Sequence, residues 1–326
     1  MRRLAALTVC AGFGMLLAAS ARAGELAIDW LDRMSVAMNQ MSYQGTFVYH
    51  QEDRMETMRI THVSDENGVR ERLVSLSGGG GEMLRDANGV SWVLGDGSSV
   101  MTDGSFQRPL FPLMPSEQEG LAAHSYEVGF AGKSLVAGHL ARKIKVEPRD
   151  HYRFGYALWL EAHSGLLLKW ELLDPDRKPL ARLMFTEIRL GSEVDPGELK
   201  PARELNRYQA VETGLPAGGS AISVEPRWAP VKIPPGFKLT AHRFQDGGED
   251  DGGEYEHLVY SDGLAAVSVY IEDPAGDTDR PERIERHGTT HAFTKSTGGR
   301  IVTVVGDVPA ATVLMIGKSV EPATVQ

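Results

Sequence analysis

The stretch that decides the fold is residues 142–190, RKIKVEPRDHYRFGYALWLEAHSGLLLKWELLDPDRKPLARLMFTEIRL. Large apolar side chains alternate here with polar or small ones at a period of two, which is the pattern of β-strands. Breaks containing Gly, Pro or Asp divide the stretch into separate strands. The predicted strands are 142–147, 152–161, 165–173 and 180–190. Because the connections are short, neighbouring strands are expected to pair antiparallel.

More strands are predicted on the N-terminal side of this stretch. The same alternation marks 43–50, 57–62, 82–86 and 90–94. Asn88-Gly89, between the last two, suits the positive φ angles of a type I′ hairpin turn. Seven or more sequential antiparallel strands describe a curved sheet wrapped over helices.

One helix is predicted before the first strand. Leu26, Trp30, Met34 and Met38 recur every four residues, which places them on one apolar stripe. We expect this stripe to pack against the sheet. The alternative is a lipid-facing surface, because Trp and Met also serve there.

One face of the predicted sheet carries more large apolar side chains than one short helix covers. In 152–160 these are Tyr152, Phe154, Tyr156, Leu158 and Leu160. If helices leave the concave side unfilled, an apolar cavity suited to acyl chains or hydrophobic peptides remains. The alternative is a larger helical plug that fills the space.

A proline-rich segment, 107–118, separates the two groups of strands. Its prolines exclude a central strand or a regular helix. We expect a fixed loop that places apolar side chains on the sheet, with a movable lid as the alternative.

A domain boundary is predicted where the composition changes to Pro, Gly, Ala and Ser. The predicted units are a large domain at 24–195, a linker at 196–223 and a small domain at 224–326. The small domain is expected to contain strands at 256–260, 264–271 and 300–305, the first two joined by Asp262-Gly263. Asp307 is expected to cap a last helix, with Pro309 in its first turn. The fold class is therefore α+β in both domains.

The first residues have the features of a secretory signal peptide. Arg2 and Arg3 precede an apolar run at 4–19, and cleavage is predicted between Ala23 and Gly24. An uncleaved membrane anchor is the alternative. Cys10 is the chain's one cysteine, so the mature product would have no thiol for catalysis or zinc binding.

The amino-acid composition and the net charge exclude some classes of protein. Of the 326 residues, 42% are hydrophobic and 24% charged, which is typical of a folded globular protein and excludes general disorder. The formal charge is −10, and loss of Arg2, Arg3 and Arg22 with the signal makes it −13. Such an acidic chain is a poor binder of nucleic acid.

No catalytic or cofactor motif is recognised in the sequence. His287 and His291 have helical metal spacing, but the residues between them supply neither a Glu nor a good helix. The glycines at 78–81 lack the Lys-Ser/Thr of a phosphate loop. The acidic segment 246–252 is expected to be a solvated turn, with loose calcium binding as the alternative. We therefore predict a protein that is not an enzyme and has no cofactor.

Several short motifs, in order along nearly the whole mature chain, resemble the RseB/MucB family of periplasmic regulators. They are Trp30-Leu31-Asp32-Arg33-Met34, Ser42-Tyr43, residues 136–146 (VAGHLARKIKV), Arg149-Asp150, Tyr152-Arg153, Tyr156, Leu158-Trp159-Leu160, Leu172-Leu173-Asp174, Tyr260-Ser261-Asp262-Gly263-Leu264, Val267-Ser268-Val269 and Val304-Val305-Gly306-Asp307-Val308-Pro309. The specificity of the resemblance comes from their number and order.

The resemblance implies both a fold and a function. The large domain would be an unclosed antiparallel β-barrel of the LolA/LppX type over helices, followed by a small α/β domain. The protein would bind the periplasmic part of an RseA/MucA-like membrane anti-sigma factor and protect it from regulated proteolysis. Lipid, lipopolysaccharide or lipoprotein acyl chains would release it, and no nucleic acid takes part.

Under this hypothesis the signal enters the large domain, and the partner contacts the small domain and the seam between the domains. The candidate lipid-cavity residues are Phe47, Tyr49, Met58, Ile60, Phe154, Tyr156 and Trp170. The residues that contact the anti-sigma factor are not identified by the sequence, and a homo-oligomer stays open. Two alternatives are a periplasmic lipid or lipoprotein carrier without a regulatory partner and an exported hydrolase that uses carboxylates paired in space.

Overall fold

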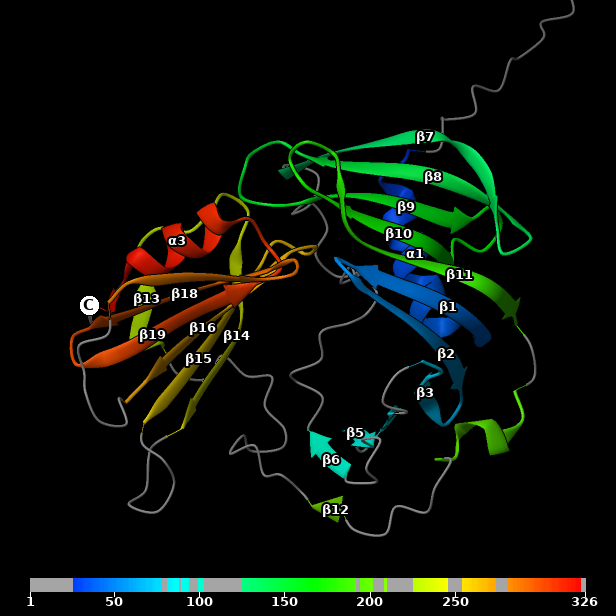
Figure 1. Ribbon diagram of the computed structural model, residues 1–326, viewed down its shortest axis with the longest axis horizontal. Coiled ribbons are helices and arrows are strands. Elements are labelled where there is room, and N and C mark those ends of the chain that lie inside the picture. Colours follow the sequence, from blue (N-terminus) through cyan, green and yellow to red (C-terminus); the bar gives the residue numbers. More distant parts are fainter. Residues whose placement is uncertain are drawn as a thin grey trace, which may run out of the picture.

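The computed structural model describes residues 26–77, 81–87, 89–93, 99–102, 125–191, 194–201, 208–209, 225–245, 254–273 and 281–323. Figure 1 shows two units side by side: a large curved sheet with one helix, and a smaller sheet with one helix. The unclosed β-rich large domain and the smaller C-terminal domain predicted from the sequence are confirmed.

The large unit begins with α1 and is otherwise a twelve-stranded sheet. Its elements are α1 (Asp29–Gln40), β1 (Tyr43–Gln51), β2 (Arg54–Asp65), β3 (Gly68–Ser75), β4 (Glu82–Asp86), β5 (Gly89–Val93), β6 (Ser99–Thr102), β7 (Tyr126–Val136), β8 (His139–Pro148), β9 (Gly155–Glu161), β10 (Leu167–Leu173), β11 (Pro179–Leu190), η1 (Pro196–Leu199) and β12 (Tyr208–Gln209). The strand order is β12-β6-β5-β4-β3-β2-β1-β11-β10-β9-β8-β7, so the described sheet has two free ends and does not close.

The four strands predicted in 142–190 are β8 to β11, each paired antiparallel with the next. β8 begins at His139 rather than at Arg142, and β10 begins at Leu167 rather than at Gly165. β9 begins at Gly155 rather than at Tyr152. Asp150 is the reason: its Oδ1 accepts a hydrogen bond from the Tyr152 backbone N–H at 2.9 Å, which turns the chain before the strand. The predicted 88–89 hairpin joins β4 to β5, and Gly89 has φ 135°, while Asn88 lies outside the described residues.

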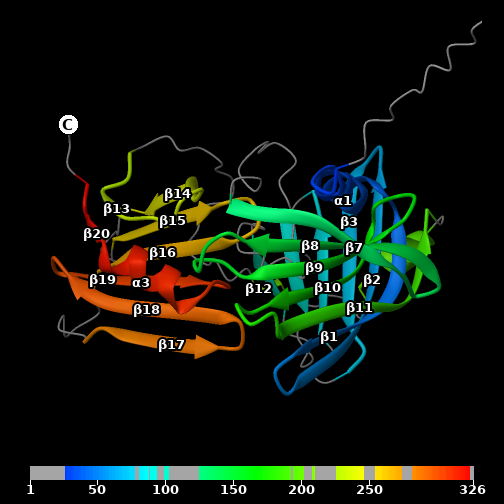
Figure 2. The same ribbon diagram turned by 90° about the horizontal axis from the view of Figure 1, so that it is seen from above.

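Helix α1 lies against one face of this sheet (Figure 2). Trp30, Met34 and Met38 of the predicted stripe are buried in the same hydrophobic core as the sheet, whereas Leu26 is exposed. Packing against the sheet, and not a lipid-facing surface, is therefore the role of the stripe from Trp30 to Met38. Burial of such a face supplies most of the stability of a short helix.

The small unit is a six-stranded sheet, a two-stranded ribbon and a helix. Its elements are β13 (Trp228–Pro230), β14 (Lys238–Gln245), β15 (Tyr255–Ser261), β16 (Ala266–Glu272), β17 (Arg283–His287), β18 (Thr290–Thr297), β19 (Arg300–Gly306), α3 (Ala310–Lys318) and β20 (Val320–Pro322). The sheet order is β14-β15-β16-β19-β18-β17, and β13 pairs with β20. Helix α3 packs on β18 and β19.

The predicted cap of this helix was wrong. Pro309 occupies the N-cap position of α3, and no side chain caps it. Asp307 instead accepts hydrogen bonds from the hydroxyls of Thr289 and Thr290, in the turn that joins β17 to β18. The carboxylate is thus used by a neighbouring hairpin, a contact that sequence spacing does not reveal.

Several predictions fall outside the described residues: the signal peptide with Ala23 and Gly24, the loop 107–118, the acidic segment 246–252 and most of the linker 196–223. Within that linker, the described parts are residues 196–201, which include η1, and the two residues of β12. Among the residues described, no helix is both long and apolar enough to cross a bilayer.

Candidate functional site at the seam between the domains

The two domains meet around a buried guanidinium group. Arg153 lies in the turn before β9, and only 1% of the residue is exposed. Its Nη1 is 3.3 Å from Oδ2 of Asp262, at the β15–β16 turn of the small domain. Its Nη2 donates a 2.6 Å hydrogen bond to the carbonyl of Pro235, also in the small domain, and its Nε is 3.4 Å from Oδ1 of Asp150. A large-domain cation is therefore enclosed mainly by small-domain oxygens.

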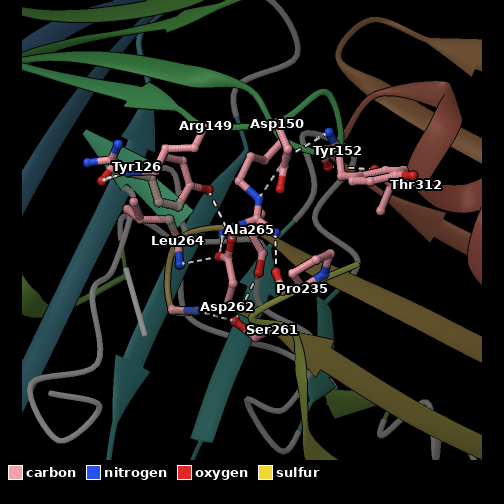
Figure 3. Close-up of polar contacts among 12 residues, drawn as sticks. Tyr126, Arg149, Asp150, Tyr152, Pro235, Ser261, Asp262, Leu264, Ala265 and Thr312 are labelled. Atoms are coloured by element: carbon pink, nitrogen blue, oxygen red, sulfur yellow. Dashed lines mark hydrogen bonds and ion pairs between the residues drawn. The ribbon is translucent and has the colours of Figure 1, made fainter. Parts of the chain in front are cut away.

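Asp262 receives contacts from both domains (Figure 3). Its side chain has no exposed area. The Tyr126 hydroxyl, at the start of β7, donates to its Oδ2 at 3.1 Å. The backbone N–H groups of Leu264 and Ala265 donate to its Oδ1 at 2.9 and 2.8 Å, which builds the β15–β16 turn. The hairpin turn predicted at Asp262-Gly263 is present but longer than predicted, because β16 begins at Ala266 rather than at Leu264. The Asp262 carboxylate in this turn also anchors the other domain.

Aromatic rings enclose the ion pair. The Arg153 guanidinium lies 5.4 Å from the Tyr126 ring centroid and 5.1 Å from that of Phe237. Burial, with the Asp262 charge second, raises the pKa of Tyr126 well above its ordinary value. Tyr126 is therefore protonated and able to donate at physiological pH. Removing one member of such a buried pair typically costs about 3–5 kcal/mol, because the other charge is left unpaired.

A second contact joins the domains at the tip of the β1–β2 hairpin. Gln51 Nε2 donates to the Thr289 hydroxyl at 2.9 Å, and Arg286 Nη2 lies 3.6 Å from the Glu52 carboxylate. Gly288 between these groups has φ 61°, and an added Cβ would lie 2.5 Å from Gln51 Nε2. Only glycine fits this turn while the hairpin tip is in place.

A pocket of about 570 Å³ opens beside the seam. It is lined by His151, Tyr152, Val231, Lys232, Ala311, Leu314, Met315, Lys318, Ser319 and Glu321. The two domains are linked at its edge, where the Thr312 hydroxyl of α3 donates to the carbonyl of Tyr152. The pocket therefore has one wall from the large domain and a floor formed by α3.

The floor is apolar and its rim is charged. Helix α3 buries Val313 and Ile316 against its own sheet, while Leu314 and Met315 on another face are half-buried and line the pocket. Val231 beside them is 65% exposed. Partly exposed apolar side chains on a second face of a helix are typical of a surface that takes a partner or ligand.

The structure brings the seven candidate lipid-cavity residues into one cluster, the core of the large domain. Phe47, Ile60, Phe154 and Trp170 are at most 7% exposed, and Tyr49, Met58 and Tyr156 pack around them. Phe47 pairs with Met58 across β1 and β2, and the Tyr49 and Trp170 ring centroids are 6.0 Å apart. A lipid cavity at these residues stays a prediction, and the pocket described above lies elsewhere, at the seam.

The ion pair at the seam was not predicted from the sequence. Arg153 falls within the predicted strand 152–161 and Asp262 within a predicted turn, and neither was predicted to form a charge pair. The available signal was an arginine between Tyr152 and Phe154, since a cation between aromatic residues of a buried strand needs a partner. That signal does not say which carboxylate the partner is.

The two histidines with metal spacing do not form a common site. His287 ends β17 and His291 lies in β18, where its Nδ1 is 2.7 Å from the carbonyl of Val308. Over the described part of the chain, no group of three or more His, Cys, Asp or Glu is placed to hold a metal ion.

An unclosed sheet over one helix, joined through a buried polar seam to a smaller sheet and helix, defines a two-domain α+β protein. Family models for the MucB/RseB N-terminal domain and the MucB/RseB C-terminal domain match residues 26–203 and 223–321. The chain belongs to the MucB/RseB family.

Relatives of known role are similar over nearly their whole length. The sigma factor AlgU regulatory protein MucB of Pseudomonas aeruginosa is 33% identical, with 95% of each chain covered. The sigma-E factor regulatory protein RseB of Escherichia coli K12 is 22% identical, with 94% of each covered. The solved MucA/MucB complex of P. aeruginosa matches with a TM-score of 0.69 and 31% identity, covering 92% of this chain and 99% of that one.

Proposed function

We propose that this protein is a periplasmic regulator that binds the periplasmic domain of a membrane anti-sigma factor and shields it from regulated proteolysis. The observation that carries the proposal is the similarity across both domains to MucB, which has been solved in complex with the periplasmic part of MucA. A carrier would need only the large domain, whereas here the similarity includes the small domain. The regulatory function is therefore favoured over the carrier alternative.

The pocket at the seam is the contact surface that we propose for the partner. Its apolar floor of Leu314 and Met315 would take apolar side chains of the anti-sigma segment. Lys232 and Lys318 at the rim would favour an acidic flank. Because the walls come from both domains, the affinity would depend on their relative position.

A lipid signal is proposed to release the partner from this protein. An acyl chain can displace the partner only if it binds the free regulator better than the complex. Sheltering one methylene from water contributes about 0.8 kcal/mol, so a handful would change occupancy more than about a hundredfold. Since Phe47, Ile60 and Trp170 are buried in the core, entry of a chain there would require repacking, which could carry the signal to the seam.

Export is proposed from the sequence features of residues 1–23. The mature chain would begin at Gly24, and N-terminal sequencing of protein recovered from the periplasm tests this. A mature chain that still begins at Met1 would rule out cleavage.

Binding to the pocket is tested by Leu314→Glu, which places a charge on the apolar floor. We expect the Kd for the anti-sigma factor's periplasmic domain, measured by calorimetry, to rise at least about tenfold, as when a central apolar contact is lost. Leu135→Glu is the matched control, because Leu135 on β7 is 73% exposed and does not line the pocket. Thermal unfolding of both variants shows whether the fold is retained. Equal affinity in the two folded variants would place the partner elsewhere.

A further inference from the structure

Strand β17 is a free edge of the small sheet. It is last in the order of the described strands and pairs with β18 alone among them. Figure 2 shows it as the outermost strand of the small domain. Ile284, the second residue of β17, is 46% exposed, which is unusual for an apolar residue on a strand. Such an edge can accept another strand.

The backbone of β17 offers hydrogen-bonding groups toward this free side. His287 and Thr290 flank the two-residue turn Gly288-Thr289, so they form a hydrogen-bonded pair. Hydrogen bonding alternates along an antiparallel pair, so Arg283, Glu285 and His287 bond to β18. The N–H and C=O groups of Ile284 and Arg286 therefore point away from β18, toward the free edge.

The charges along this edge are self-complementary. Residues 282–286 read Glu-Arg-Ile-Glu-Arg. If a second copy pairs antiparallel with Ile284 opposite Ile284, each Glu282 faces an Arg286 and each Arg283 faces a Glu285. All four charged pairs are then of opposite sign, and the outward backbone groups of Ile284 face each other. Opposite charges directly across a sheet stabilise the pairing.

Neighbouring registers are excluded by the same charges. A shift of two residues, which keeps the backbone groups in register, places Arg283 opposite Arg283 or Glu285 opposite Glu285. Like charges directly opposite destabilise a strand pair. The sequence therefore favours one register, and that register has the twofold symmetry of a closed dimer.

The charged groups are free to exchange partners. Within one chain Arg283 pairs with Glu285, Arg286 with Glu52, and Glu282 with Lys318. All six side chains are at least 40% exposed, so these intrachain pairs contribute little and can be replaced by pairs across a dimer.

We propose that two copies of this protein associate through β17, antiparallel and centred on Ile284, to join the two small sheets into one. The interface is narrow and charged, so the dimer is weak and sensitive to salt. The charges on β17 then specify a partner strand and do more than protect the edge from aggregation.

Two charge-reversed variants test the proposal, because each should dimerise poorly alone and their mixture should restore the dimer. The acidic variant Arg283→Glu/Arg286→Glu and the basic variant Glu282→Arg/Glu285→Arg each carry like charges throughout the edge. We expect sedimentation velocity to give a dimer Kd more than about tenfold above that of the wild type for either variant alone. An equimolar mixture should recover the dimer, because the two edges complement each other. A wild type that is monomeric up to its solubility limit, or a dimer unchanged in both variants, would overturn the proposal.

A cysteine at the symmetry centre tests the register. Hydrogen-bonded antiparallel pairs have Cα atoms about 5.5 Å apart, within the range that a disulfide spans. In a Cys10→Ala background, Ile284→Cys should form an interchain disulfide under mild oxidation, and 1 M NaCl should slow it. Leu135→Cys, at the more exposed position on β7, is the control and should remain largely monomeric. Equal cross-linking at the two positions would contradict the β17 interface.

Discussion

Asp262 is the residue on which the contact between the domains depends most, because it both builds the β15–β16 turn and neutralises Arg153. Asp262→Asn keeps the shape but removes the charge. We expect the free energy of unfolding, measured with urea, to fall by about 3–5 kcal/mol, because Arg153 becomes an unpaired buried cation. Asp176→Asn, at a side chain 77% exposed, is the control and should change stability by less than about 1 kcal/mol.

A double variant separates loss of charge from loss of packing. Arg153→Met together with Asp262→Asn removes both charges and should recover most of the lost stability. If the double variant is as unstable as the sum of the single ones, the ion pair is not the cause.

His257 makes the small domain sensitive to acid. Burial, with the charges of Arg243 and His242 next, lowers its pKa to about 4 from the usual 6.5. The folded state thus favours the neutral ring. Its contribution to the free energy of unfolding is fully present above pH 6.5 and is lost as the pH falls toward 4. His257→Phe keeps the stacking on Tyr270 but cannot be protonated. Over this pH range its free energy of unfolding should fall by up to about 3 kcal/mol less than that of the wild type.

Urea unfolding at pH 7, 5.5 and 4 measures this difference. His163→Asn is the control, because the His163 side chain is 91% exposed. Parallel pH profiles for the wild type and His257→Phe would show that another group sets the acid sensitivity.

At the scale of elements, α3 is held against its sheet by a close approach at Gly317. A Cβ there would lie 2.2 Å from Cδ1 of Phe293. Gly317→Ala should therefore lower stability by about 1–3 kcal/mol, although alanine is the better helix former by about 1 kcal/mol. Gly129→Ala on β7 is the matched control, since an added Cβ there meets nothing within 4 Å. Thermal unfolding compares them, and a stabilised Gly317→Ala would show that α3 can shift.

Elements were predictable from sequence where their pattern is local. The alternation that predicted β8 to β11, and the four-residue spacing of α1, depend on burial on one face. Strand β7 was not predicted, because both its faces are partly exposed and Phe130 and Leu135 lie outside the core. The Arg153–Asp262 pair was not predicted, because long-range pairing of charges leaves no periodic signal in the sequence.

At the scale of the whole molecule, both domains contribute residues to the pocket that we propose as the binding surface. The seam holds them by one buried ion pair and by the hydrogen bond from the β1–β2 hairpin to Thr289. If the partner binds in this pocket as proposed, its affinity depends on how the two domains are arranged, because both domains form the walls. This dependence gives a physical route by which a change inside the large domain can alter what the small domain holds.

Protection of an anti-sigma factor from its protease is the function that we propose for this protein. The direct measurement is the cleavage rate of the purified periplasmic domain of the anti-sigma factor by the site-one protease, with and without saturating amounts of this protein. We expect slower cleavage when the protein is present and no slowing of an unrelated substrate of the same protease. Equal cleavage rates of the anti-sigma domain in the two samples would contradict it.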